Sequence, residues 1–228
     1  MMKLSNLGNV GTMIRSGKEQ LLRHSLSPAE RTALFNTQLL KGEHLIWVDQ
    51  PDLSVHLAKP DRYMIPISLV WEGFFAYALF QKISTGQFGN SLIDAFFLII
   101  FNLIGVYLVV GRFFLKRWRK AQTYYALTNR RAMVHTRFFG EKTDSVFLAN
   151  VAMTKMCMHA NGSGDLKFGD PQWGEQYYAN TGMDVMLGLQ PTGTPTFFDV
   201  PNIHAVQQVA LDQLKETIDL RHLTRKAR

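Results

Sequence analysis

Residues 63–82 read YMIPISLVWEGFFAYALFQK, and residues 92–115 read LIDAFFLIIFNLIGVYLVVGRFFL. A helix needs about 20 mostly apolar residues to cross the roughly 30 Å hydrocarbon core of a bilayer, and each stretch has about that length. The polar segment 84–91 between them is short enough for a tight turn. The sequence therefore predicts a transmembrane helical hairpin over residues 63–115.

The basic residues beside this hairpin predict its orientation. In a soluble chain, a net charge of +7 would suggest a nucleic-acid partner. Here the connecting-loop side has only Lys82, whereas the outer ends carry Lys59, Arg62, Arg112, Lys116, Arg117, Arg119 and Lys120. By the positive-inside rule, both termini lie in the cytoplasm and segment 84–91 faces outward. We therefore expect a multi-pass protein of the cytoplasmic membrane that has no nucleic-acid partner.

The remaining composition agrees with this topology. Cys157 is the single cysteine, so no intramolecular disulfide can form, as expected of a large reduced cytoplasmic portion. Residues 1–25 contain no continuous apolar core of the kind that a cleavable signal needs. The first membrane helix is then expected to act as its own uncleaved targeting signal.

A basic and aromatic collar follows the second apolar stretch. Such a collar suits the anionic headgroups at the inner face of a membrane, which makes anionic lipids an expected partner. The predicted interface anchor consists of Arg112, Lys116, Arg117, Trp118, Arg119 and Lys120.

Each apolar stretch also carries one polar residue near its middle, Glu72 in the first and Asn102 in the second. An ionisable group at mid-bilayer costs several kcal/mol, so it must have a partner or a function. In a hairpin the two residues lie at similar depth, which predicts a hydrogen bond between Asn102 and a protonated Glu72. A contact with another membrane subunit is the alternative, whereas an ion pathway is disfavoured because two helices cannot enclose a pore.

The segment before the hairpin divides into two parts. Residues 1–42 are read as a flexible segment followed by a short helix from Ser27 to about Leu40, with a capping box formed by Ser27 and Glu30. The apolar face of this helix is small enough to dock on the later domain or to lie against lipid. Residues 43–62 form a pre-membrane segment whose extended run around Trp47 predicts a strand of the later sheet.

Residues 121–220 show short alternating runs separated by turn signals. Such spacing predicts an antiparallel barrel or sandwich. From Pro201 to about Leu220, apolar residues recur on one helical face, and residues 221–228 form a basic tail. About seven strands followed by one helix are the order of a pleckstrin-homology-like (PH-like) barrel. The runs are 123–128, 132–136, 145–148, 151–159, 165–168, 185–189 and 196–200.

Several motifs in this order carry a family resemblance. They are Leu40-Lys-Gly-Glu43 leading to Trp47 and Pro51, the two spans, Tyr125-Ala-Leu-Thr-Asn-Arg-Arg131, Gly162-Ser-Gly-Asp-Leu-Lys-Phe168, and Phe197-Phe-Asp199 before the last helix. Together they resemble bacterial membrane proteins with a PH-like domain. The resemblance implies an α+β membrane protein in the bacterial inner membrane, and it implies fold and location more than activity. The insertion from Asp170 to Asp184 departs from the pattern.

Some side chains could bind a metal or act as a nucleophile, and ordinary packing is the alternative interpretation. Met156-Cys-Met-His159 holds soft-metal ligands. Alternate residues of a strand point to opposite faces, so these four side chains do not converge. A nucleophilic pair of Cys157 and His159 lacks an orienting third group. No catalytic residue, cofactor or metal is predicted, and the chain is not expected to be an enzyme.

A basic turn between two strands is the remaining candidate site. Its residues would meet the phosphates of lipid headgroups in a domain tethered close to the membrane, although a solvated turn is the alternative. The lipid-headgroup candidates are Arg130, Arg131, Arg137 and Lys142. The expected function is a scaffold or accessory role through contacts with proteins, with itself or with headgroups. The alternative is an accessory or assembly subunit of a larger transport or respiratory complex, bound through the hairpin.

Overall fold

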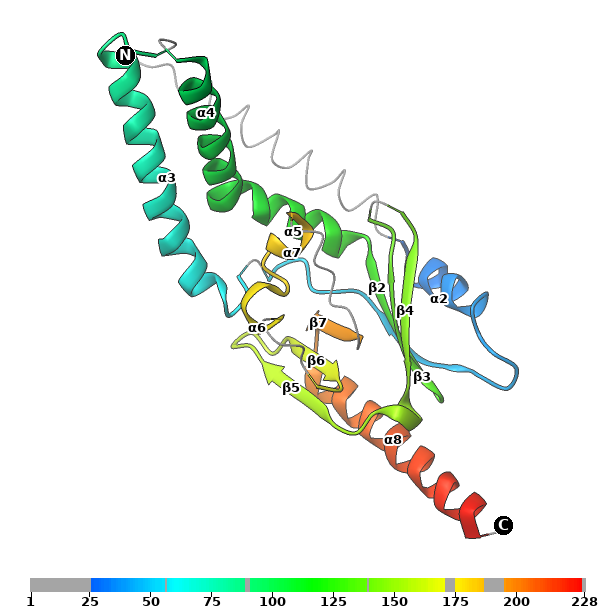
Figure 1. Ribbon diagram of the computed structural model, residues 1–228. Coiled ribbons are helices and arrows are strands. Elements are labelled where there is room, and N and C mark those ends of the chain that lie inside the picture. Colours follow the sequence, from blue (N-terminus) through cyan, green and yellow to red (C-terminus); the bar gives the residue numbers. More distant parts are fainter. Residues whose placement is uncertain are drawn as a thin grey trace, which may run out of the picture. The chain divides into compact units, whose positions relative to one another are not determined.

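The computed structural model describes residues 26–55, 57–88, 91–138, 140–170, 175–186 and 195–226 (Figure 1). Its internal contacts divide the chain into two units. The sheet unit comprises Met1–Ser54, Trp118–Asp170 and Gly193–Arg228, and the hairpin unit comprises Val55–Arg117 and Pro171–Thr192. The insertion at 170–184, expected within the cytoplasmic domain, therefore groups with the hairpin from residue 171 onward.

Two antiparallel sheets build the sheet unit. The first has the order β1-β2-β3-β4, with β1 at Leu45–Asp49, β2 at Thr123–Thr128, β3 at Arg131–Thr136 and β4 at Lys142–Phe147. The second has the order β5-β6-β7, with β5 at Thr154–Met158, β6 at Gly164–Phe168 and β7 at Thr196–Val200. No ladder joins the two sheets among the described strands, so the expected barrel is not closed. The α+β class is confirmed.

Strand β1 precedes the hairpin in sequence, yet it pairs with β2, which follows the hairpin. Val48 lies opposite Ala126, and Asp49 lies opposite Tyr125. The prediction that the pre-membrane segment supplies a strand to the later sheet is confirmed. The hairpin is thus inserted between two neighbouring strands of one sheet.

The core of the sheet unit lies between its two sheets and the last helix, α8 (Ile203–Lys226). The Tyr125 ring stacks on Phe197, with ring centroids 4.7 Å apart. The Tyr125 hydroxyl also donates to the Phe198 carbonyl at 3.1 Å and accepts from its N–H at 2.9 Å. This one side chain ties β2 to β7, and its burial raises the pKa of Tyr125. The helix residues in the core are Ile203, Val206, Ala210 and Leu214.

Two predicted boundaries differ from the structure. Helix α8 continues to Lys226, so the basic segment from Arg221 is helical rather than a separate tail, and residues 227–228 lie outside the described ranges. The strand expected at 185–189 is wrong at its start, because Val185 and Met186 belong to the short helix α7 (Met183–Met186). A short apolar run alone does not distinguish a strand from a helix. Upstream of α7 lies another short helix, α6 (Glu175–Tyr178).

The first described helix, α2 (Pro28–Asn36), has the expected capping box. The Ser27 hydroxyl accepts from the Glu30 N–H, and the Glu30 carboxylate accepts from the Ser27 N–H at 2.7 Å. The helix ends at Asn36, earlier than predicted. Phe35 is fully buried beside Tyr124, so α2 docks on the first sheet rather than on lipid. The segment predicted to be flexible, residues 1–25, lies outside the described residues.

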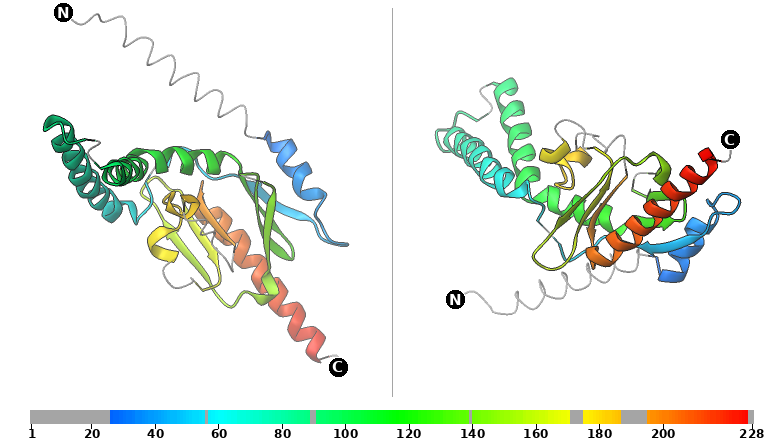
Figure 2. Two further views of the ribbon diagram at one scale, coloured as in Figure 1. Left: turned by 45° about the horizontal axis from the view of Figure 1, so that its top comes forward. Right: turned by 90° about the horizontal axis from the view of Figure 1, so that it is seen from below.

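Two long helical stretches build the hairpin. Helix α3 spans Asp61–Ser84, and α4 (Leu92–Val106) continues through a π-helical turn (Tyr107–Gly111) into α5 (Arg112–Ala121). Helices α3 and α4 lie side by side (Figure 2). The Phe75 and Phe101 rings stack between them, with centroids 4.8 Å apart.

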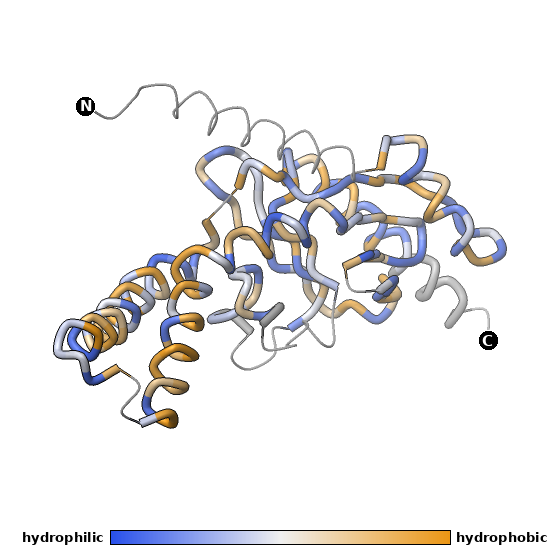
Figure 3. Tube along the Cα trace, turned by 90° about the horizontal axis from the view of Figure 1, so that it is seen from above, coloured by the Kyte–Doolittle hydropathy of each residue, from blue (hydrophilic) through white to orange (hydrophobic). Residues whose placement is uncertain are grey.

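Hydrophobic residues recur along both of these helices (Figure 3). Only 6% of the most apolar 18-residue window of each stretch is buried. Val70, for example, is 75% exposed, and Leu92 is 83% exposed. Both stretches, Asp61–Ser84 and Leu92–Ala121, are long and apolar enough to cross a membrane.

Candidate functional site

Glu72 and Asn102, the two polar residues of the apolar stretches, do not bond to each other. The Asn102 amide nitrogen donates to the Leu98 carbonyl at 2.7 Å and to the Phe75 carbonyl of α3 at 3.2 Å. The Glu72 Oε2 atom is buried and has no hydrogen-bond partner among the described residues. The expected Glu72–Asn102 hydrogen bond is therefore not found among the described residues, and the Asn102 amide donates to backbone carbonyls instead.

Glu72 instead lies against a glycine of the facing helix. A Cβ atom built on Gly105 would lie 1.8 Å from Glu72 Oε2 and 3.3 Å from the Glu72 Cα atom. No other residue type fits at this position without displacing the Glu72 side chain. The absence of a side chain at Gly105 thus lets the carboxyl group lie between the two helices.

Ion pairs close the hairpin at both of its ends. Near the connecting segment, the Lys82 ammonium lies 3.1 Å from the Asp94 carboxylate, and both side chains are partly exposed. At the opposite end, Arg112 contacts the Asp61 carboxylate, and both side chains are fully buried. The two ends therefore differ in burial, and the Asp61 end is the more strongly enclosed.

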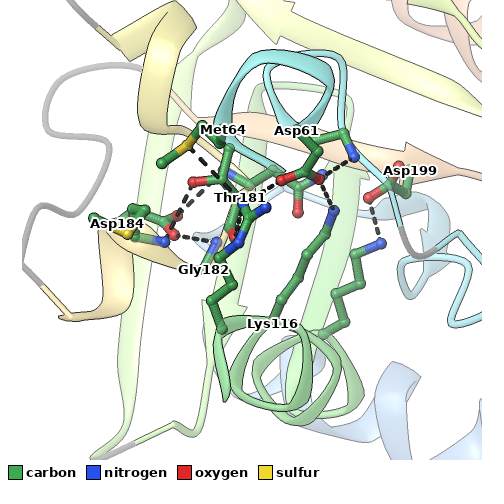
Figure 4. A network of polar contacts seen from close by, with 12 residues as sticks. Asp61, Met64, Lys116, Thr181, Gly182, Asp184 and Asp199 are labelled. Carbon is green, nitrogen blue, oxygen red and sulfur yellow. Dashed lines mark hydrogen bonds and ion pairs between the residues drawn. The ribbon is translucent and has the colours of Figure 1, made fainter. Parts of the chain in front are cut away.

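The Asp61 carboxylate is the centre of this enclosed end. Its Oδ2 atom accepts the Ala58 N–H at 2.6 Å, and the Lys116 ammonium lies 3.8 Å from the same oxygen (Figure 4). Arg112 also donates through Nε to the Leu108 carbonyl at 2.7 Å. The cluster thus ties the start of α3 to the end of the second helical stretch.

The segment before α7 covers the same end of the hairpin (Figure 4). The Thr181 carbonyl lies 3.5 Å from an Arg112 Nη atom, and the Tyr107 hydroxyl donates to the Gly182 carbonyl at 2.7 Å. Gly182 has φ +88°, and a Cβ atom there would lie 2.4 Å from the Arg112 carbonyl oxygen. Asp184 fixes this turn by accepting the Gly182 N–H at 3.1 Å.

The predicted interface collar separates into two groups. Arg112, Lys116 and Lys120 recur every fourth residue on one face of α5 and are buried beside carboxylates, so they are not lipid-facing anchors. The other members of the collar are Arg117, Trp118 and Arg119, of which Trp118 is 40% exposed and packs on Phe138. These three remain candidates for the interface.

A second buried ionic cluster lies within the sheet unit. Lys120 places its ammonium 2.5 Å from the fully buried Asp199 carboxylate. His159 lies 3.6 Å from Asp199 and 3.5 Å from Asp165. Asp165 in turn accepts the Asp199 N–H at 2.9 Å, and Asp199 has the uncommon φ of +51°. A network of ion pairs and hydrogen bonds thus holds the end of β7.

Three of these residues have the chemistry of metal ligands. One ligand atom from each of His159, Asp165 and Asp199 lies within 4.8 Å of the others. The Lys120 ammonium, however, lies on the Asp199 carboxylate and would repel a divalent cation. The donor set therefore fits an ion-pair network better than a metal centre.

Cys157, expected to pack within its strand, lies opposite Asp165 on β6 and is partly buried.

Arg131, which was predicted to bind a lipid headgroup, instead binds a carboxylate within the fold. Its Nε and Nη2 atoms donate to the two oxygens of Glu43 at 2.9 and 2.8 Å. The Glu43 side chain is fully buried and also accepts from Thr128 Oγ1 at 2.7 Å and from the Leu40 N–H at 2.8 Å. Burial raises the pKa of Glu43, but these hydrogen bonds outweigh it and hold the pKa at about 2.

The other headgroup candidates are solvent-exposed. Arg130 is exposed at the turn between β2 and β3. Arg137 pairs with Glu141 at 3.3 Å, and Lys142 pairs with Asp144 at 2.9 Å. Exposed pairs of this kind are weak and leave the cations accessible.

Sequence reasoning missed Asp61, Glu43 and Asp199, the acidic members of the three buried clusters. One available signal was the spacing of Arg112, Lys116 and Lys120, which places three cations on one helical face. Such a face needs anions opposite it when it is buried. The partners themselves are distant in sequence, as in the pair of Glu43 and Arg131.

No protein-family model, curated protein or solved structure matches the chain. The structure itself contains a hairpin of two long apolar helices, two antiparallel sheets and a C-terminal helix.

Proposed function

We propose that this chain is a non-enzymatic membrane protein of the bacterial cytoplasmic membrane. In this proposal, the hairpin anchors a PH-like domain that contacts proteins, a second copy of itself or lipid headgroups. The observation that carries the proposal is the exposure of the two long apolar helical stretches, because only 6% of the 18-residue apolar window of each is buried. Apolar surface of this extent is unfavourable in water at about 25 cal/mol per Å² and favours a lipid environment.

The charges at the two ends of the hairpin support its orientation. Asp94 neutralises Lys82 on the connecting-loop side, whereas Arg62, Arg117 and Arg119 add positive charge at the other end. This asymmetry supports a cytoplasmic location for both outer ends. The sheet unit would then lie in the cytoplasm.

The order of the elements supports a PH-like domain. A four-stranded sheet, a three-stranded sheet and a helix that enters the core between them follow in that order. The sequence motifs quoted above agree with this assignment. A PH-like domain inserted around a membrane hairpin favours a role in scaffolding over a role in catalysis.

The first experiment tests the anchor and the partner together. We expect the full chain in the membrane fraction after alkaline carbonate extraction, because α3 and α4 would be embedded. Release into the soluble fraction would contradict the proposal. Purification in mild detergent then identifies the role, since stoichiometric recovery with a transport or respiratory complex would favour the alternative of an accessory subunit.

The second experiment addresses headgroups and uses Arg130. The full chain in mild detergent is titrated with a short-chain phosphatidylglycerol. Arg130→Glu should weaken binding several-fold if the turn between β2 and β3 recognises the phosphate. The matched control is Lys155→Glu, at an exposed lysine paired with Asp170, which should leave binding unchanged. Arg131 is unsuitable for this test because its substitution breaks a buried ion pair.

A further inference from the structure

The ion pairs at the two ends of the hairpin mark the depth of its residues in a membrane. Lys82, near the end of the 24-residue α3, pairs with Asp94. Asp61, at the start of the same helix, pairs with Arg112. A rise of 1.5 Å per residue puts the two pairs roughly 30 Å apart, which is the thickness of the hydrocarbon core. In the proposed orientation, the pair of Asp61 and Arg112 therefore marks the inner boundary of the hydrocarbon.

The insertion turn, residues 179–182 between α6 and α7, lies at the depth of this inner pair (Figure 4). The Thr181 carbonyl lies 3.5 Å from an Arg112 Nη atom. A Cβ atom on Gly182 would lie 2.4 Å from the Arg112 carbonyl oxygen. The Gly182 carbonyl also accepts from the Tyr107 hydroxyl at 2.7 Å. Three contacts with the end of the second apolar stretch thus fix the depth of the insertion turn.

Hydrogen bonds within the insertion turn suit this depth. Irregular backbone is tolerated near hydrocarbon only where its polar groups are satisfied by other groups of the protein. The buried Asp184 carboxylate accepts the Gly182 N–H at 3.1 Å and the Asn180 N–H at 3.3 Å. Thr181 Oγ1 accepts the Met183 N–H at 3.2 Å. These three N–H groups therefore have partners that do not depend on water.

Exposed tyrosines lie close to the same boundary. Tyr177, in the short helix directly before the insertion turn, is 66% exposed. Tyr63 follows Asp61 by two residues in α3 and is 58% exposed. Tyrosine is enriched at membrane–water interfaces because its ring is apolar and its hydroxyl is polar. The exposed ring of Tyr177 thus lies where a membrane interface favours it.

We infer that the insertion is a further membrane contact of this chain, in which the Tyr177 ring lies among the lipid headgroups of the inner leaflet. The inference rests on the proposed membrane location and names the lipid interface as the partner of the insertion. Lipid is favoured over a protein partner because the hairpin itself holds the insertion turn at the boundary. Lipid surrounds that boundary whenever the hairpin is embedded.

The experiment measures the depth of a spin label in liposomes of phosphatidylethanolamine and phosphatidylglycerol. The full chain carries a nitroxide on Tyr177→Cys in a Cys157→Ser background. Its collision rates with oxygen, which enters hydrocarbon, and with a water-soluble nickel complex are compared. The Tyr177→Cys label should be several-fold less accessible to the nickel complex than a label on Asn150→Cys, an exposed position of the sheet unit. It should remain accessible to oxygen, as should a label on Tyr63→Cys.

A glycine substitution tests whether the hairpin holds the insertion at this depth. Gly182→Ala places a Cβ atom against the Arg112 carbonyl oxygen, at a φ of +88°. The insertion turn should then leave the hairpin, and the Tyr177→Cys label should become several-fold more accessible to the nickel complex. Gly86→Ala is the matched control, because Gly86 also has a positive φ but its Cβ atom would meet nothing within 4 Å. This control should leave the depth of the label unchanged.

The outcomes separate this inference from the proposed function through a label on Val70→Cys, in the exposed middle of α3. With this label in hydrocarbon, a Tyr177→Cys label that is as accessible to nickel as Asn150→Cys, or that is shielded from both reagents, overturns the inference alone. An unchanged depth of the Tyr177→Cys label in Gly182→Ala overturns the role of the hairpin contacts. A Val70→Cys label that is itself accessible to nickel overturns the proposed function first.

Discussion

Two glutamates of this chain show how differently its two units treat a buried carboxyl group. In the sheet unit, Glu43 accepts four hydrogen bonds, two from Arg131 and one each from Thr128 and the Leu40 N–H. In the hairpin unit, Glu72 has one buried oxygen and no hydrogen-bond partner among the described residues. The fold satisfies the first carboxyl with internal donors, and it leaves an oxygen of the second buried against Gly105 without a hydrogen bond.

The difference indicates what each residue does. A carboxylate with four donors stabilises the structure that supplies them, here the junction of the chain before β1 with the turn between β2 and β3. A carboxyl without donors in an apolar helix does not stabilise the isolated hairpin. Its unsatisfied oxygen costs free energy instead.

The largest effect on stability is expected at Glu43. Glu43→Ala leaves Arg131 without its partner in a mostly buried position, so the free energy of unfolding should fall by about 4 kcal/mol. Pulse proteolysis of the detergent-solubilised full chain in urea measures this change. Glu141→Ala, which removes the exposed partner of Arg137, is the control and should cost less than about 1 kcal/mol. Equal losses of stability in the two variants would contradict the conclusion that the buried pair stabilises the fold more than the exposed pair.

A slightly smaller effect is expected from the second buried pair of the sheet unit. Lys120→Met leaves the Asp199 carboxylate without the ammonium beside it and should cost about 3 kcal/mol. Adding Asp199→Asn should recover part of this loss, because asparagine tolerates a positive φ and carries no charge. The same proteolysis assay applies, with Lys155→Met as the exposed control. A double variant that is less stable than Lys120→Met would show that the pair is not the source of the loss.

Acid should act on the same carboxylate as the Glu43 substitution. The pKa of Glu43 is about 2 in the folded chain and about 4.5 when unfolded, so the unfolded state takes up its proton first as the pH falls. The resulting stabilisation is complete above pH 4.5 and is lost between pH 4.5 and pH 2, with a total of about 3 kcal/mol. Across this pH range, the free energy of unfolding should fall less steeply in Glu43→Ala than in the natural chain. Identical slopes would rule out Glu43 as the titrating group.

The smallest effect is expected at Glu72. Glu72→Leu removes a carboxyl that has no donor, so the stability of the isolated chain should change by less than about 1 kcal/mol. Heat-induced unfolding in detergent, under conditions that keep the chain monomeric, gives the comparison. A loss as large as that of Glu43→Ala would mean that Glu72 is satisfied within its own hairpin.

Local sequence signals predicted many of the elements. Thr123–Thr128 and Thr196–Val200 appear at the predicted bounds because alternation and turn residues are local signals. The capping box of Ser27 and Glu30 is equally local. The strand predicted at residues 185–189 is wrong at its start, which forms part of α7. A short apolar run of this kind fits a strand and a helix alike.

The buried clusters were not predictable in the same way. Asp61 and Arg112 are separated by the whole hairpin, and Glu43 and Arg131 by the hairpin and β2. Nothing near Arg131 in sequence distinguishes it from the exposed Arg130. Only the pairing of β1 with β2 brings Glu43 to the turn where Arg131 lies.

The central claim is that the hairpin crosses the membrane with both outer ends in the cytoplasm. Single cysteines at Thr37, Gln87 or Asn150, in a Cys157→Ser background, can be labelled in intact cells with a membrane-impermeant maleimide. The account predicts that Gln87→Cys is labelled from outside and that Thr37→Cys and Asn150→Cys are labelled only after permeabilisation. Labelling of Thr37→Cys or Asn150→Cys in intact cells, or protection of Gln87→Cys, would contradict it.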